Sequence, residues 1–252
     1  MKGGTLHRFQ VPKPALDGRR VELRGSALRH LRDVLRLGNG DRVEVFDGAQ
    51  RSFVAEIRSV GRSSADLDLL SPIESERESA LSLTLAVALS KGSKLDWVVE
   101  KATELGVSRI VPFASERTIP ERGSSLNRAD RWQRIAAAAT AQSGRPRCPE
   151  IVRLTGFSAV LSLAAEHDRA ILFWEAGDRP LESARDGLVR RVLLVTGPEG
   201  GFSAKEASQA KAARFTLASL GPRILRAETA AIAVVTLGQF LWGDLGETRV
   251  DR

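Results

Sequence analysis

Two short turns rich in glycine and proline carry the residues best suited to chemistry. The first, 197–202, reads Gly-Pro-Glu-Gly-Gly-Phe and follows the apolar run 192–195. The second, 220–226, reads Leu-Gly-Pro-Arg-Ile-Leu-Arg and follows the short apolar stretch 215–217. Glycine lets a ligand lie against bare main chain, and proline stiffens the turn. Such turns suit the binding of a small molecule, although glycine and proline also punctuate ordinary loops.

Each turn lies between a predicted strand and a predicted helix, the helices starting near Ser203 and Glu228. Turns in this position lie at the carboxyl edge of a parallel sheet, where open α/β sheets bind their ligands. The fingerprints G-x-G-x-x-G and G-x-x-x-x-G-K-[ST] do not occur here, which disfavours a dinucleotide or a nucleoside triphosphate. The pattern instead predicts that the two turns wrap an adenosine group, with main-chain groups bonding its edge.

The second turn also brings charged side chains to this edge. Arg226 carries a planar, always charged guanidinium that can stabilise a developing anion. It can equally form a salt bridge with Glu228 or Glu199 that only pins the loop. Glu228 can act as a general base or as the favourable negative charge at the start of the last helix, and the helix role is preferred. Thr229 is a candidate cap of that helix.

Together, 197–202 and 220–230 resemble the signature of the RsmE family. Its members are SPOUT-class methyltransferases that methylate N3 of a uridine in small-subunit ribosomal RNA. The stretches 90–96, 100–107 and 131–145 resemble the same family, so the resemblance covers nearly the whole chain. One departure is Ser143, where the family more often has Cys, so no thiol chemistry is expected there.

The resemblance implies a fold and a reaction, and the two turns supply the candidate site residues. The fold is an α/β SPOUT-type parallel-sheet domain with a C-terminal trefoil knot, preceded by a small PUA-like β-barrel. The reaction is uridine-N3 methylation in the decoding region of 16S rRNA, with S-adenosylmethionine as cofactor and a homodimer whose site spans both subunits. Arg226 and Glu228 are the catalytic candidates. The expected cofactor-binding residues are Leu194, Thr196, Gly197, Pro198, Glu199, Gly200, Gly201, Leu220, Gly221, Ile224, Leu225, Arg226, Thr229 and Ala230.

Changes of composition along the chain predict two domains. Residues 1–73 contain short strands closed by glycine turns, as in a small barrel, and the run 35–48 resembles the PUA-like domain of RsmE-type proteins. Residues 74–80 are expected to be a polar linker. The methyltransferase domain is expected over 81–252, and its first apolar run, 81–89, is typical of a strand buried on both faces.

The charge of the chain favours RNA as a partner. The net charge is +7 and the isoelectric point about 10.3, which favours a polyanion. The predicted helix 27–35 has a basic face, although charges on a small domain are usually just solvated. Loop arginines in so arginine-rich a chain can also lack a role. The candidate RNA-binding residues are Arg8, Arg29, Arg32, Arg36, Lys91, Lys94, Arg145 and Arg147.

Other classes of protein fit the sequence less well. No run reaches 18 apolar residues and no signal peptide is evident, so a cytoplasmic protein is expected. A single cysteine, Cys148, rules out an internal disulfide and a cysteine-based zinc site, and His7 and His30 lack partners at ligand spacing, so no metal is expected. Two alternatives stay open: a SPOUT enzyme that methylates a ribose 2′-hydroxyl, and a PUA-type RNA-binding protein without activity.

Overall fold

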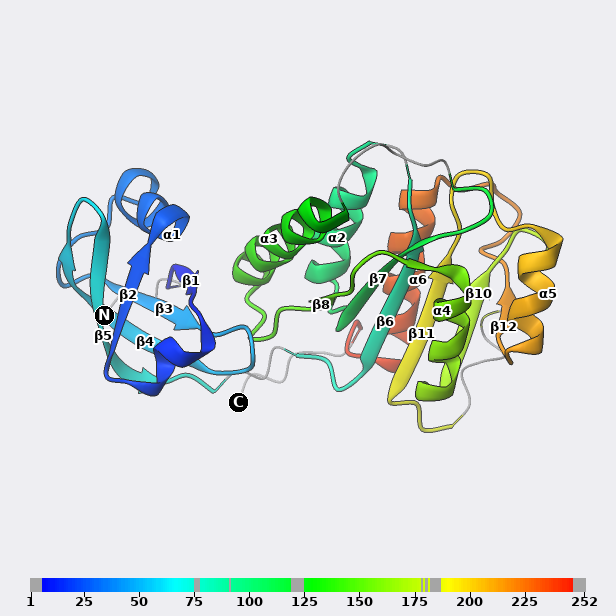
Figure 1. Ribbon diagram of the computed structural model, residues 1–252. Helices are drawn as coiled ribbons and strands as arrows, with labels where there is room; N and C mark the ends of the chain where they lie inside the picture. Colours follow the sequence, from blue (N-terminus) through cyan, green and yellow to red (C-terminus); the bar gives the residue numbers. More distant parts are fainter. Residues whose placement is uncertain are drawn as a thin grey trace. The chain divides into compact units, whose positions relative to one another are not determined.

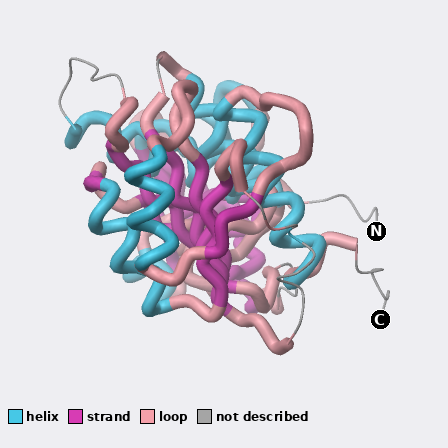
Figure 2. Tube along the Cα trace, turned by 90° about the vertical axis from the view of Figure 1, so that its right-hand side faces the viewer, coloured by secondary structure: helices cyan, strands magenta, loops and turns pink. Residues whose placement is uncertain are grey.

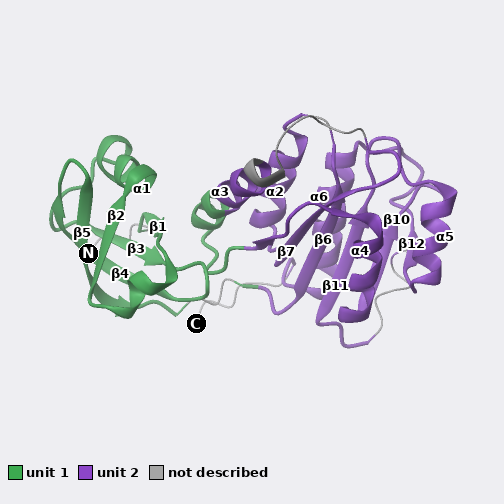
Figure 3. Ribbon diagram, in the orientation of Figure 1, with its two compact units in different colours: residues 1–78, 137–148 green, residues 79–136, 149–252 purple. Residues whose placement is uncertain are grey.

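The protein divides into two compact units, coloured separately in Figure 3. The first comprises residues 1–78 and 137–148, and the second 79–136 and 149–252. The division falls in the predicted linker 74–80, but the assignment of 137–148 to the first unit was not indicated by the sequence. The domain limits 1–73 and 81–252 stay predictions. The computed structural model describes residues 6–74, 78–90, 92–118, 125–177, 179, 181 and 187–246.

The first unit is a curled five-stranded sheet with the order β1-β3-β4-β5-β2 (Figure 1). A helix, α1 (Gly25–Arg29), continues as one π-helical turn, His30–Val34, and a 3-10 helix spans Lys13–Asp17. Apolar side chains such as Leu31, Ile57 and Leu67 are fully buried between helix and sheet. The fold is the PUA-like arrangement that the sequence predicts. Its strands are β1 Arg8–Gln10, β2 Arg20–Arg24, β3 Arg42–Phe46, β4 Ser52–Val60 and β5 Ser64–Pro72.

Two arginines explain why residues 137–148 belong to the first unit. Arg8 forms an ion pair of 2.9 Å with Glu44 and donates to the carbonyl oxygens of Thr140 (3.0 Å) and Arg145 (2.9 Å). Arg145 is itself buried and paired with the Glu78 carboxylate. The expectation that these two arginines are exposed for RNA is therefore wrong: both side chains are used inside the unit.

The second unit is an α/β layer structure built on a parallel sheet with the order β12-β10-β11-β6-β7-β8, to which β9 adds beside β7. Figure 2 shows helices on both sides of the strands. The strands are β6 Ser82–Ala88, β7 Arg109–Ala114, β8 Glu150–Ile151, β9 Thr155–Gly156, β10 Arg169–Phe173, β11 Arg191–Thr196 and β12 Thr216–Ala218. The helices are α2 Lys94–Glu104, α3 Ser125–Ser143 (which continues into the first unit), α4 Phe157–Ser162 with the 3-10 turn Leu163–Glu166, α5 Ala204–Ala212 and α6 Ala227–Trp242.

Alternate residues of β11 pack against opposite layers. Leu193 and Val195 join a buried cluster with residues of α4 and α5. Leu194 faces α6, where a Cβ atom on Gly238 would lie only 2.9 Å from its Cδ1. Glycine at 238 therefore lets the last helix approach the sheet closely. Among the described residues, no helix is long and apolar enough to cross a bilayer.

α5 shows how local sequence starts an element at the right place. Ser203 Oγ accepts from the N–H of Glu206 (3.2 Å), and the N–H of Ser203 donates to the Glu206 carboxylate (2.9 Å). This reciprocal capping box satisfies two main-chain donors at the helix start. The predicted start near Ser203 is confirmed.

A half-buried histidine makes the stability of the second unit sensitive to acid. His167 Nδ1 lies 2.8 Å from the Leu163 carbonyl oxygen, which can only accept, so Nδ1 carries the hydrogen. Nε2 is then left to accept from the Thr84 hydroxyl at 2.9 Å. Burial lowers the pKa of His167 below its usual value, because the charged ring is poorly solvated.

We therefore expect His167 to stabilise the fold fully above about pH 6.5 and progressively less as the pH falls. The reason is that the unfolded chain takes up the proton first. The melting temperature of the wild type should fall more steeply between pH 7.5 and 5.5 than that of His167→Gln. Equal slopes for the two proteins would contradict this role.

Candidate active site

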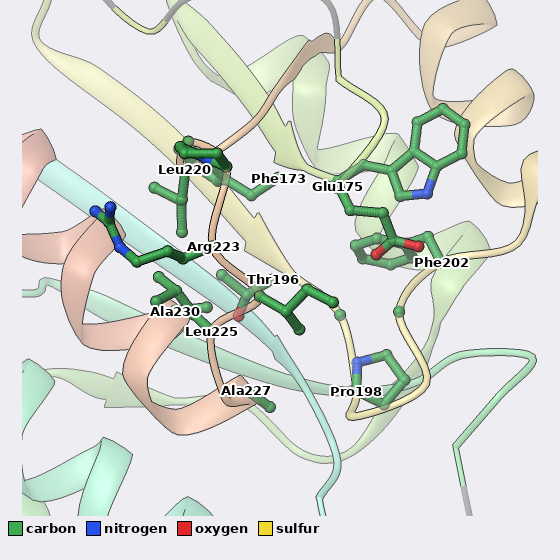
Figure 4. Close-up of a pocket in the computed structure, with 16 residues that line it drawn as sticks. Phe173, Glu175, Thr196, Pro198, Phe202, Leu220, Arg223, Leu225, Ala227 and Ala230 are labelled. Carbon is green, nitrogen blue, oxygen red and sulfur yellow. The ribbon is translucent and has the colours of Figure 1, made fainter.

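Three neighbouring parallel strands end at one hollow, drawn in Figure 4. β10 lies between β11 and β12, and Phe173 is aligned with Thr196 on one side and with Ala218 on the other. The turns that follow β11 and β12, here called the first corner (197–202) and the second corner (220–226), therefore come together. The hollow between them contains about 840 Å³ of empty space, part of it open to solvent.

The first corner is tight because two of its glycines have no room for a side chain. A Cβ atom on Gly197 would lie 3.1 Å from the Phe202 ring. Gly201 has a φ of +65°, in the left-handed region, and donates its N–H to the carbonyl oxygen of Pro198 at 2.9 Å. The ring of Phe202 is buried beneath the turn. The corner thus presents bare main chain on a rigid support.

The second corner is more open. Gly221 has a φ of +91°, and a Cβ atom there would meet nothing within 4 Å. Glycine is therefore favoured at this position by the backbone conformation and not by a lack of space. Leu225 is half-buried, whereas Ile224 is 97% exposed. Arg226 ends the corner in an extended conformation and its carbonyl oxygen accepts from the Ala230 N–H at 2.8 Å. α6 therefore begins directly at the rim of the hollow.

One buried polar atom in the hollow points to a ligand. Thr196, the last residue of β11, is 1% exposed and lines the hollow. Its Oγ1 is buried and forms no hydrogen bond with any described residue. A buried hydroxyl is normally satisfied, so this atom is suited to a polar group of a bound molecule.

A lysine from α2 joins the two corners. Lys94 Nζ lies 2.8 Å from Glu199 Oε1 in the first corner and 3.7 Å from Glu228 Oε2 at the start of α6. The hydrogen bond with Glu199 raises the pKa of Lys94 above its usual value, and the charge of Glu228 acts in the same direction. Lys94 was a candidate for RNA contact, but here it holds both carboxylates that were considered as partners of Arg226. The described residues give Arg226 no ion pair.

The segment after β7 supports the first corner from outside the hollow. Arg117 Nη1 donates to the Gly200 carbonyl oxygen at 2.7 Å. Ser203 Oγ donates to Glu116 Oε2 at 2.8 Å, and the Glu116 N–H donates to Glu206 Oε1 at 2.9 Å. Sequence reasoning missed this support, because nothing in the sequence places residues 116 and 117 beside the corner.

The structure sorts the candidate cofactor-binding residues into two groups. Those that line the hollow are Thr196, Gly197, Pro198, Gly201, Leu220, Gly221, Ile224, Leu225 and Ala230. Those outside its lining are Leu194, Glu199, Gly200, Arg226 and Thr229. Leu194 was expected to line an adenine pocket, but its side chain is buried under α6.

Several lining residues were missed. They are Phe173, Trp174, Glu175, Phe202, Pro222, Arg223 and Ala227. The stretch 173–175 was missed because only the spatial order of the strands brings β10 between the corners, and the chain order does not reveal it. Within the described part of the chain, no group of three or more His, Cys, Asp or Glu side chains is placed to hold a metal.

The remaining RNA candidates are distributed over both units. Arg29, Arg36 and Arg147 are exposed on the first unit. Arg32 is half-exposed, pairs with Asp33 at 2.6 Å and donates to the Arg62 carbonyl oxygen at 3.1 Å. Lys91 lies outside the described residues. A role in RNA binding stays a prediction for these residues.

Comparison with known proteins matches two parts of the chain to families. Residues 77–239 match a family described as an RNA methyltransferase domain, and residues 23–70 match an RNA methyltransferase PUA domain. The ribosomal RNA small subunit methyltransferase E of Synechocystis sp. is 36% identical over 214 residues, which are 83% of this chain and 69% of that protein. The protein of that name from Bacillus subtilis is 29% identical over 219 residues, 82% of this chain and 85% of its own.

Solved structures agree over nearly the full length. A methyltransferase of Legionella pneumophila, in complex with the cofactor SAM, is 31% identical with a TM-score of 0.89, covering 96% of this chain and 100% of its own. The ribosomal RNA small subunit methyltransferase E of Neisseria gonorrhoeae, bound to S-adenosylmethionine, is 33% identical with a TM-score of 0.86, covering 95% and 99%.

The PUA-like sheet, the parallel sheet with two glycine corners and the matched domains define an RNA methyltransferase of the SPOUT class. The resemblance seen in 197–202 and 220–230 is confirmed by relatives that extend over most of the chain. The chain belongs to the ribosomal RNA small subunit methyltransferase E family, RsmE.

The Lys94 bridge generates a direct prediction for the first corner. In Lys94→Met, the corner loses its ion pair with α2, so its main chain should open more often. Because an exposed ion pair contributes little, amide exchange in 197–201 should be at most about fivefold faster. Lys101→Met is the matched control, since Lys101 pairs only with Glu100 and Glu104 among the described residues. Exchange that is equal in all three proteins would contradict the bridging role.

Proposed function

We propose that this protein transfers the methyl group of S-adenosylmethionine to N3 of a uridine in the decoding region of 16S rRNA. The observation that carries the proposal is the hollow between the two glycine corners, in a chain of the RsmE family. Two relatives of about one-third identity were solved with this cofactor bound. The proposal includes a role in rRNA processing during assembly of the small ribosomal subunit, in the cytoplasm.

The residues of the hollow fit this cofactor. Bare main chain at Gly197 and Gly201 can bond the adenine edge, and Leu220 and Leu225 offer apolar contacts to its faces. The unpaired Thr196 hydroxyl adds a polar partner. When bound, S-adenosylmethionine supplies a methyl group activated by the positive charge on its sulfur.

The target atom needs help from the protein. Uridine N3 carries a proton at neutral pH, and its removal leaves an anion spread over O2 and O4. The protein must hold the base out of any stack and stabilise that charge. Arg226 suits this role, because it is exposed at the rim of the hollow and none of the described residues pairs with it. Its guanidinium is always charged and can donate to one of these oxygens.

Glu228 has two roles open to it. It lies in the first turn of α6, where a negative charge is favourable. Its Oε2 is buried and accepts no hydrogen bond from the described residues, although Lys94 Nζ lies 3.7 Å away. This oxygen therefore also has the capacity to accept a proton. The helix role is the one we propose, and general-base action is the alternative.

We propose that the protein acts as a homodimer on RNA. Large apolar side chains are exposed on the second unit at Phe240 of α6 (61%) and Trp97 of α2 (44%), and a subunit contact would cover such surface. The exposed arginines Arg29, Arg36 and Arg147 supply charge for RNA on the first unit. Light scattering of the purified protein measures the subunit number directly, and a monomer would contradict this part of the proposal.

Replacement of the two charged residues should separate their roles. Arg226→Ala should lower kcat by about 10²- to 10³-fold with little change in the KM for the cofactor, because its charge is needed when the anion develops. Glu228→Gln should lower the melting temperature and leave kcat nearly unchanged, because Glu228 stabilises the start of α6. A loss of kcat in Glu228→Gln as large as that in Arg226→Ala, with an unchanged melting temperature, would instead make Glu228 the proton acceptor.

The activity itself is tested with labelled S-adenosylmethionine and small ribosomal subunits that lack the modification. The label should appear on N3 of one uridine in 16S rRNA, located by mass spectrometry. A label on a ribose 2′-oxygen would contradict the proposal and identify a SPOUT enzyme that methylates a ribose 2′-hydroxyl. RNA binding without transfer would identify an RNA-binding protein without activity.

A further inference from the structure

One charged side chain in the hollow, Glu175, has no partner among the described residues. Glu175 follows β10 and lines the hollow near Phe202 (Figure 4). No described residue gives its carboxylate an ion pair or a hydrogen bond. The other charged lining residue is Arg223, in the second corner. Glu175 is therefore the single carboxylate among the lining residues of a hollow that is otherwise largely main chain and apolar.

The backbone that carries Glu175 is held firmly. The N–H of Trp174 donates to the Ala218 carbonyl oxygen at 2.9 Å. The N–H of Gly177 donates to the Trp174 carbonyl oxygen at 3.0 Å. A Cβ atom on Gly177 would lie 2.5 Å from the main chain of Ala218, so the turn presses directly against β12. The position of residue 175 is thus fixed by the sheet and not by a loose loop.

The carboxylate of Glu175 faces the first corner. A Cβ atom on Gly201 would lie only 2.9 Å from Glu175 Oε2, and Gly201 has a φ of +65°. Bare main chain at 201 therefore leaves room for this carboxylate at the wall of the hollow. Glu175 is exposed, so water solvates its carboxylate when the hollow is empty, and O–H or N–H donors of a bound molecule can take the place of that water.

We propose that Glu175 binds hydroxyl or ammonium donors of the methyl donor in this hollow. The inference rests on the proposed function and assigns one more residue to its cofactor. A carboxylate only accepts hydrogen bonds, so the matching groups are those of the cofactor that carry O–H or N–H. Two groups meet this description, the ribose 2′,3′-diol and the α-ammonium of the methionine part.

Calorimetry with two ligands tests the assignment and separates the two groups. S-adenosylhomocysteine carries both the diol and the ammonium, whereas 5′-methylthioadenosine carries the diol alone. In Glu175→Gln, loss of a charge-assisted bond should raise the Kd by about 10- to 100-fold. Weaker binding of both ligands assigns Glu175 to the ribose, and weaker binding of S-adenosylhomocysteine alone assigns it to the ammonium.

Controls keep the result decisive. Glu100→Gln changes a carboxylate that does not line the hollow and should bind both ligands like the wild type. Glu175 has no partner among the described residues, so Glu175→Gln should have the same melting temperature as the wild type. Unchanged affinity of Glu175→Gln for both ligands would overturn the inference while the proposed function stands. A wild type that binds neither ligand would overturn both.

Discussion

The site depends on parallel pairing of three strands. β10 lies between β11 and β12 with aligned ends, so the segments after all three open on the same edge of the sheet. Parallel strands need crossover connections, and here α5 makes the crossover between β11 and β12. If β12 lay elsewhere in the sheet, the two corners would be separated and no hollow would form.

Close contacts at three glycines hold the elements around the hollow in place. Gly177 presses on β12, Gly197 packs on Phe202, and Gly238 brings α6 against β11. In each contact the missing glycine side chain lets two elements approach closely. Lys94 and Arg117 then secure the first corner from outside through Glu199 and the Gly200 carbonyl oxygen. The chain thus holds main-chain donors in place before any ligand arrives, which reduces the cost of binding.

The sequence predicts much of this arrangement because its local signals agree. Apolar runs mark the buried strands, Ser203 and Glu206 start α5, and glycines mark both corners. Three features were not predictable from such signals. The place of Glu175 beside the corners depends on the order of the strands in the sheet. The burial of Arg8 and Arg145 depends on contacts between distant parts of the chain. The side chain of Leu194 faces α6 because of its position in β11. The trefoil knot stays a prediction of the family resemblance, since threading of a loop has no periodic signature.

A crystal structure with S-adenosylhomocysteine tests the central claim most directly. The account predicts the ligand between the first and second corners, with its adenine against main chain and a polar group near Thr196. Electron density for the ligand at any other surface of the protein, with the hollow between the corners filled by side chains, would contradict the account.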